Sequence, residues 1–247
     1  MQSNIPDLCL VIPCYNPEEN WASELIKAFQ ELKLILNNAK IHLIIVNDGS
    51  SRNFTEGFRK LKLEIEEITL INSLINKGKG DALRKGFSVS NSPVIIFTDV
   101  DIPFEVRHIA MIYRLIISGK YDVVIGERGK EYYQTCSFLR NILSKALRFI
   151  VRILFNEKIS DSQCGIKGFN STARKIFLTT KIKGYLFDLE FLHSAVAANL
   201  KINSLSVKPR KQIFLTSLRS STVLQELINL VIILSSKQLK YFMRSLS

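Results

Sequence analysis

The sequence predicts an α/β fold with a mostly parallel central sheet and helices on both faces. Short apolar runs alternate with segments of helical spacing, which is the pattern of successive βαβ units. Polar residues follow several of these runs, as is typical of open sheets that bind ligands at the carboxyl ends of their strands. The chain has 247 residues, so we expect one domain over 1–221 and a helix with a basic tail over 222–247.

The first elements form a βαβ unit. Leu8 to Ile12 and Ile41 to Val46 are apolar runs, and Glu18 to Leu36 between them has apolar residues at helical spacing. The alternation continues with a weaker strand at 67–72, a helix at 81–89, a strand at 93–98, a helix at 105–118 and a strand at 121–126.

A different pattern follows residue 130. Phe138 to Phe155 is a helical candidate with a wide apolar face and a stripe of basic residues that includes Arg140, Arg148 and Arg152. A helix of this kind without acidic residues is typical of the membrane interface, but a core helix with a solvated basic face has the same pattern. Both interpretations stay open on the pattern alone.

Composition limits the possible partners. The chain has 34 Lys and Arg against 22 Asp and Glu, a net charge of +12, which favours anionic partners such as nucleic acid, nucleotide phosphates or an acidic membrane surface. Its cysteines and histidines have no metal-ligand spacing, so we expect neither a zinc site nor a disulfide framework. The sequence begins without a signal-peptide pattern, and its apolar runs are shorter than the ~18 residues of a spanning helix. We therefore expect membrane contact only from the surface.

Two carboxylates end a predicted strand in the segment VIIFTDVDIP at 94–103. Asp99 and Asp101 would repel each other near a core unless a cation lies between them, and Mg²⁺ or Mn²⁺ bound to a diphosphate is a suitable cation. The alternative is a turn in which Asp101 caps the next helix. Asp48 likewise ends a strand, where it would contact a base or ribose or simply form a turn.

The segment NKGKGD at 76–81 is a glycine-rich basic loop before a helix, where backbone N–H groups and lysines meet anions. It is not a Walker A loop, and the sequence has no GxGxxG after the first strand and no GxSxG. These absences argue against a P-loop enzyme, a nicotinamide dehydrogenase and an acyl transferase.

Together these segments resemble the motifs of family 2 glycosyltransferases with the GT-A nucleotide-sugar-binding fold. The similar segments are LVIPCYN at 10–16, VNDGSS at 46–51, NKGKGDALRKGF at 76–87, FTDVDIPF at 97–104 and VVIGER at 123–128. Two later segments, ISDSQCGIKGF at 159–169 and FDLE at 187–190, resemble signatures of dolichyl-phosphate glucose and mannose synthases.

The resemblance implies transfer of a hexose from a nucleotide diphosphate sugar to a polyprenyl phosphate, with inversion. It assigns the nucleotide site to Pro13, Tyr15, Asn16, Asp48, Lys79 and Asp99, and the metal with its diphosphate to Asp99 and Asp101. It assigns the lipid phosphate to Arg128 and Arg140, and the sugar and acceptor to Gln163 and Asp188. Ile102 and Pro103 depart from the family pattern beside the carboxylates.

The acceptor affects what Asp188 does. A phosphate monoester has its second pKa near ~6 and is mostly dianionic at neutral pH, so no carboxylate need take its proton. Asp188 is then expected to orient sugar hydroxyls or a loop, or to be the N-cap of a helix over 189–200.

We therefore expect an enzyme that uses Mg²⁺ or Mn²⁺. On the resemblance, UDP-glucose is the preferred donor, GDP-mannose is the alternative donor, and a soluble saccharide is the alternative acceptor. A lipid acceptor favours the interfacial interpretation of Phe138 to Phe155 and a peripheral location on the cytoplasmic side of a membrane. We expect no nucleic-acid partner.

Overall fold

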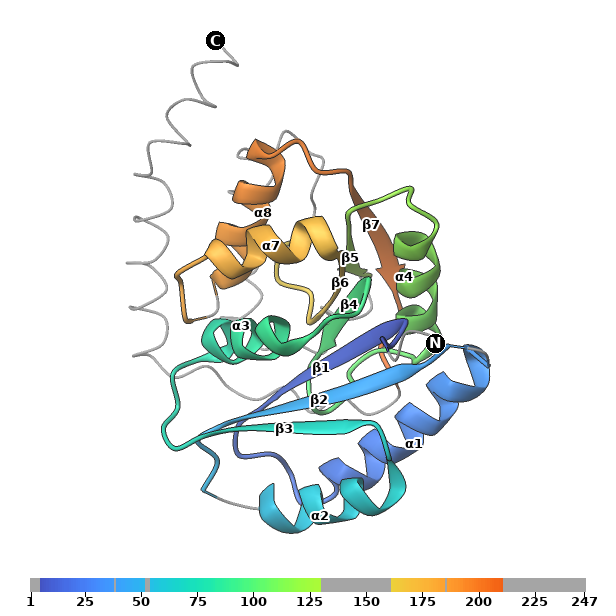
Figure 1. Ribbon diagram of the computed structural model, residues 1–247, viewed down its shortest axis with the longest axis vertical. Helices are drawn as coiled ribbons and strands as arrows, with labels where there is room; N and C mark the ends of the chain where they lie inside the picture. The colour runs from blue at the N-terminus through green and yellow to red at the C-terminus, as the bar shows by residue number, and fades with distance from the viewer. Residues whose placement is uncertain (1–4, 38, 52–53, 130–160, 185, 211–247) are drawn as a thin grey trace.

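The structure is a computed structural model, and it describes residues 5–37, 39–51, 54–129, 161–184 and 186–210. Its centre is a seven-stranded sheet with the order β3-β2-β1-β4-β6-β5-β7 (Figure 1). The strands are β1 (Leu8–Cys14), β2 (Ile41–Asp48), β3 (Ile68–Ser73), β4 (Val94–Thr98), β5 (Val123–Arg128), β6 (Ile166–Asn170) and β7 (Ile202–Val207).

Helices cover both faces of the sheet, and each face has its own apolar core. One core packs under α1 (Trp21–Ile35), α2 (Phe54–Glu64) and α4 (Arg107–Ile117). The other packs under α3 (Lys79–Val89), α7 (Ser171–Thr179) and α8 (Phe187–Ala197). Residues of β1 alternate between the two cores, as the period of a strand requires.

Strand β6 is the exception to the parallel arrangement. It pairs antiparallel with both β4 and β5, and it places Lys167 opposite Phe97. Its residues alternate between the faces, with Ile166 in the core under α4 and Phe169 in the aromatic core under α3 and α8. Lys167 therefore points to the same face as Phe169.

The predicted α/β fold class is confirmed, and each strand and helix expected before residue 130 is present within a few residues of its expected bounds. Helix α2, strand β6, helix α7 and strand β7 were not anticipated, whereas the helix expected at 189–200 corresponds to α8. The predicted helix at 138–155, Arg140 and the segment 222–247 lie outside the described residues, so these predictions and the proposed domain boundary stay predictions. In the part of the chain that the structure describes, no helix is long and apolar enough to cross a bilayer.

Candidate active site

Hydrogen bonds connect the loop after β1 to the loop after β2. The backbone N–H of Asn16 donates to Ser50 Oγ at 3.0 Å, and the N–H of Ser51 donates to Asn16 Oδ1 at 2.9 Å. Asn16 has φ +45°, a left-handed conformation that asparagine tolerates better than most residues. Tyr15, beside it, is exposed, so these strand ends form an accessible rim.

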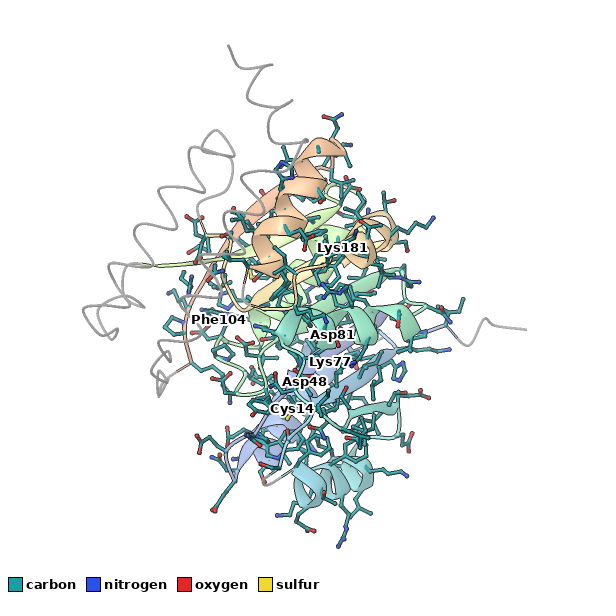
Figure 2. The ribbon with its side chains drawn as sticks, turned by 90° about the vertical axis from the view of Figure 1, so that its left-hand side faces the viewer. Cys14, Asp48, Lys77, Asp81, Phe104 and Lys181 are labelled. Carbon is teal, nitrogen blue, oxygen red and sulfur yellow. The ribbon has the colours of Figure 1, made fainter. Side chains whose placement is uncertain are left out.

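Asp48 connects the end of β2 to the start of α3. Its buried carboxylate accepts the backbone N–H groups of Lys77 at 2.9 Å and of Gly78 at 2.8 Å. Figure 2 shows Asp48 next to Lys77 at this junction. Gly78 has φ +100°, and a Cβ there would lie 2.5 Å from the carbonyl oxygen of Lys183, so only glycine fits without strain. Asp48 thus holds the basic loop in place, and its predicted contact with a nucleotide stays a prediction.

Asp48→Ala is expected to lower the free energy of unfolding by about 2–4 kcal/mol, because two N–H groups lose a charged acceptor. Urea unfolding followed by circular dichroism measures the change. Glu56→Ala on α2 is the control: it breaks only an exposed ion pair with Arg59 and should change stability by less than about 0.5 kcal/mol. Equal effects of the two substitutions would contradict this role of Asp48.

Lys79 begins α3 and forms an ion pair with Asp99, the residue that follows β4. Its ammonium also lies 5.5 Å from the centre of the Phe97 ring, within the range of a cation–π contact. Burial alone would lower the pKa of Lys79, but Asp99, Asp188 and Asp101 together raise it above its usual value. Lys79 is therefore held in its protonated form beside these carboxylates.

The carboxylate turn, residues 99–102, is closed by a hydrogen bond from the N–H of Ile102 to the carbonyl oxygen of Asp99 at 3.0 Å. Ile102 is buried with φ +43°, an unusual conformation for a β-branched residue and one that costs energy. Asp101 lies at the exposed rim, yet desolvation by surrounding atoms and then the charge of Asp99 raise its pKa to about 6. The alternative in which Asp101 caps the next helix is wrong, because Val106 is the N-cap of α4.

The carboxylate turn suits a divalent cation shared with phosphate. Two carboxylates face one ammonium, and among the described residues no group of three His, Cys, Asp or Glu side chains could enclose a metal ion. Mg²⁺ and Mn²⁺ in phosphate sites commonly take one or two carboxylates and complete their coordination with water and phosphate oxygens. Asp99 and Asp101 fit that requirement.

The loop at residues 161–165 links β5 to the carboxylate turn, and it is called the catalytic loop here because it contains Gln163, which is predicted to face the sugar and acceptor. Arg128 at the end of β5 donates to Asp161 through Nε and Nη2, both at 2.6 Å. Burial would raise the pKa of Asp161, but the Arg128 guanidinium outweighs it and holds the pKa below its usual value. At the other end of the loop, Gly165 lies against Asp99, where a Cβ would be 2.2 Å from Oδ2. Arg128, which is predicted to attract the lipid phosphate, thus forms an ion pair with Asp161 in the structure.

Asp188 is the second residue of α8 and is buried. It forms an ion pair with Lys167 at 2.9 Å. Burial raises the pKa of Asp188, while Lys167 and Lys79 oppose that rise. The interpretation of Asp188 as an N-cap is wrong, because α8 begins one residue before Asp188 and its N-cap is Leu186. The Glu190 carboxylate points elsewhere: it accepts the backbone N–H groups of Lys181 and Ile182.

The structure brings four predicted residues into one electrostatic cluster: Lys79, Asp99, Asp101 and Asp188. Asp48, a fifth predicted residue, holds the loop that precedes Lys79. Pro13, Tyr15 and Asn16 lie at the end of β1, and the half-buried Gln163 lies in the catalytic loop.

Sequence reasoning gave no role to Lys167, Asp161 or Gly165. The segment DSQCGIKGF at 161–169 could have indicated that these residues have a role, because a lysine interrupts an otherwise apolar strand pattern there.

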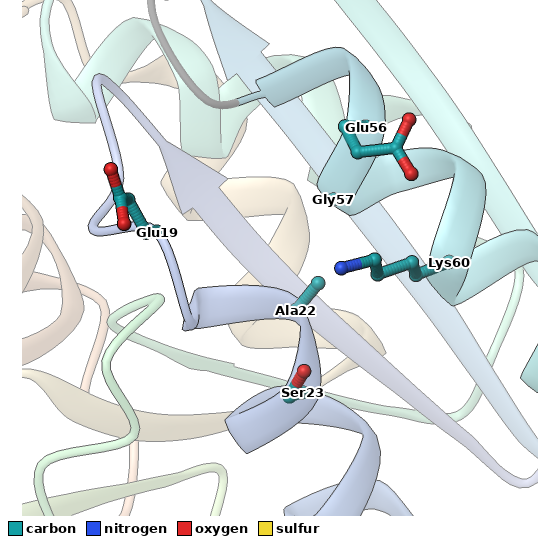
Figure 3. A pocket seen from close by; sticks show the side chains of 6 residues that line it. All are labelled: Glu19, Ala22, Ser23, Glu56, Gly57 and Lys60. Atoms are coloured by element: carbon teal, nitrogen blue, oxygen red, sulfur yellow. The ribbon is translucent and has the colours of Figure 1, made fainter.

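A separate pocket lies between α1 and α2 (Figure 3). The side chains around it include Glu19, Glu56 and Lys60, and none of the predicted site residues lines it. The site described above is therefore defined by side-chain contacts at the strand ends and not by this pocket.

A mostly parallel sheet that carries a carboxylate turn beside a basic loop and helix is the architecture of a GT-A glycosyltransferase. Solved structures of this class share the fold. The chain belongs to glycosyl transferase family 2, whose family model matches residues 9–182.

Similar curated proteins include dolichyl-phosphate beta-glucosyltransferases of Drosophila melanogaster and Saccharomyces cerevisiae. The first is 30% identical over 217 residues, which is 82% of this chain and 66% of the relative. The second is 30% identical over 220 residues, which is 81% of this chain and 66% of the relative. The chain thus spans just under two thirds of the length of these proteins.

Among solved structures, glucosyl-3-phosphoglycerate synthase from Mycobacterium tuberculosis in complex with Mn²⁺, UDP and glucosyl-3-phosphoglycerate is similar, with a TM-score of 0.60. The alignment covers 84% of this chain and 73% of the synthase at 13% sequence identity. At this identity the similarity shows the fold.

Proposed function

We propose that the protein transfers glucose from UDP-glucose to a polyprenyl phosphate, with inversion at the anomeric carbon. The observation that carries the proposal is the carboxylate turn, which meets Lys79 and the loop held by Asp48 at one edge of the sheet. The named activity of the dolichyl-phosphate beta-glucosyltransferase relatives supports glucose and a lipid phosphate.

Asp99 and Asp101 would hold a Mg²⁺ or Mn²⁺ ion, and the solved synthase with Mn²⁺ and UDP supports such a cofactor for this fold. The ion would neutralise the charge that develops on the diphosphate leaving group. Lys79 already lies on the Asp99 carboxylate, so its ammonium would lie next to the same phosphates when the donor is bound. The backbone of the loop held by Asp48 would approach the nucleotide.

A phosphate acceptor fits the state of Asp188. The lipid phosphate attacks as a dianion and needs no general base. Asp188 is buried and paired with Lys167, which suits a carboxylate that orients neighbouring groups better than one that exchanges protons with the acceptor. Arg128 and Arg140 remain the proposed attractants of the lipid phosphate. Association with the membrane surface is part of the proposal and depends on residues 138–155.

The test incubates the purified protein with Mn²⁺, short-chain polyprenyl phosphate and radiolabelled UDP-glucose or GDP-mannose. Labelled lipid from UDP-glucose, lost on addition of EDTA and restored by excess Mn²⁺, is the expected result. If labelled lipid forms only from GDP-mannose, the donor is GDP-mannose and not UDP-glucose. If the sugar is transferred only to soluble saccharides, the acceptor is a soluble saccharide and not a polyprenyl phosphate. No labelled product from either donor would refute the proposal.

A further inference from the structure

The side chain of Lys167 in β6 is fully buried, with 0% of its surface exposed. An ammonium group loses its hydration at such a position and is tolerated only when nearby groups replace it. Among the residues that the structure describes, the Lys167 ammonium contacts the Asp188 carboxylate at 2.9 Å, the carbonyl oxygen of Cys164 at 2.7 Å and the Phe97 ring, whose centre is 5.3 Å away.

The three partners belong to three different parts of the site. Cys164 lies in the catalytic loop, Asp188 lies in the first turn of α8, and Phe97 is two residues before Asp99 in the chain. The ammonium of Lys167 therefore connects the loop, the helix and the strand end around the carboxylate turn.

The catalytic loop is held in place at both of its ends. Cys164 is buried, and its neighbour Gly165 is in such close contact with Asp99 that no side chain fits between them. The other end of the loop is fixed by the pair between Asp161 and Arg128. A movement of the Cys164 carbonyl would therefore displace either Asp99 or Arg128.

We propose that Lys167 is a positioning residue for the transfer reaction: its ammonium holds the catalytic loop and Asp188 in place around Asp99. This inference rests on the proposed function. The competing explanation is a structural ion pair, which apolar residues of similar volume can often replace at little cost. The two explanations differ in what happens to the loop and to kcat when the charge is removed.

Lys167→Met keeps the length and apolar stem of the side chain and removes the ammonium. Without any substrate, hydrogen exchange followed by mass spectrometry should show faster exchange at the amides of the catalytic loop than in the wild type. In the transfer assay, kcat should fall about 30-fold, since a displacement of about 1 Å at an active site can cost up to about 100-fold. The KM for UDP-glucose should stay within about threefold, because the loop held by Asp48 is untouched.

Arg84→Met is the matched control. Arg84 is a partly buried cation of α3 that donates to Thr180 Oγ1 at 3.1 Å and to the carbonyl oxygen of Ile182 at 2.9 Å. Its removal should lower the melting temperature without changing kcat of the folded enzyme. A folded Lys167→Met enzyme with unchanged loop exchange, or with kcat within about threefold of the wild type, would overturn the inference.

If Lys167→Met fails to fold, the double variant Lys167→Met with Asp188→Leu removes both buried charges and should recover the fold. The loop amides should still exchange faster in it, because the tether to Cys164 is lost, and unchanged exchange would overturn the inference. These exchange measurements do not depend on the reaction. A wild-type protein that transfers no glucose would refute the proposed function separately.

Discussion

Asp99→Asn is expected to reduce the rate of glucose transfer about 1,000-fold, the largest effect of any single change at the site. The ion that Asp99 would help to hold supplies several kcal/mol of transition-state stabilisation, and each 1.4 kcal/mol or so is a tenfold change in rate. The substitution removes the charge and keeps the shape of the side chain. The rate is measured with saturating UDP-glucose and polyprenyl phosphate over a series of Mn²⁺ concentrations.

The fold should survive this change, because the ion pair between Asp99 and Lys79 is partly exposed and such pairs contribute little to stability. Circular dichroism and the melting temperature check this point. Glu56→Gln, on the exposed surface of α2, removes one carboxylate elsewhere and should leave transfer unchanged. A folded Asp99→Asn enzyme with nearly the wild-type rate would show that the carboxylate turn is not the metal site.

Gly165→Ala is expected to lower kcat about 100-fold without any change of charge. The added Cβ would lie 2.2 Å from Asp99 Oδ2, so the carboxylate or the loop must move. A displacement of about 1 Å in a reacting group can cost about 100-fold in rate. Steady-state kinetics with UDP-glucose and polyprenyl phosphate gives kcat, and titration with Mn²⁺ and UDP reports whether the donor site has shifted.

Gly168→Ala is a closely matched control. The added Cβ would lie 2.2 Å from Ile112 Cγ2, so the overlap is equally severe but falls in the core under α4. Overpacking of this kind costs about 1–3 kcal/mol of stability, and it should leave kcat of the folded enzyme unchanged. If both variants are less stable than the wild type but kcat falls only in Gly165→Ala, the close approach of Gly165 to Asp99 serves the reaction. An equal loss of kcat in both would mean that the effect is one of stability.

The sequence was sufficient to predict most of the alternating strands and helices before residue 130. Leu8 to Ile12 is an uninterrupted apolar run and Ile41 to Val46 is apolar except for His42, and a strand buried on both faces of a parallel sheet requires such a run. Helix α2 was not anticipated because it buries only Phe54, Gly57 and Leu61, too few apolar positions to stand out from the charged residues around them.

Strand β6 and the partners of the site could not be predicted in the same way. β6 is only five residues long and contains a glycine and a buried lysine, both unusual in a central strand. The burial of Lys167 depends on Asp188 and the Cys164 carbonyl, which local pattern does not bring together. Asp48, Asp99 and Asp101 were found because they directly follow or end strands, where position alone indicates the site.

The place of β6 in the sheet also determines when the protein can acquire its site during synthesis. β6 lies between β4 and β5 although it follows both in the chain, and residues 94–98 find their antiparallel partners only at 166–170. Contacts between such distant segments form slowly and expose unpaired strand edges until they do. A nascent chain that ends before β6 can pair β1 to β4 but has no connection to β5. The carboxylate turn of such a chain would lack its neighbour Gly165, so binding competence should arise late in translation.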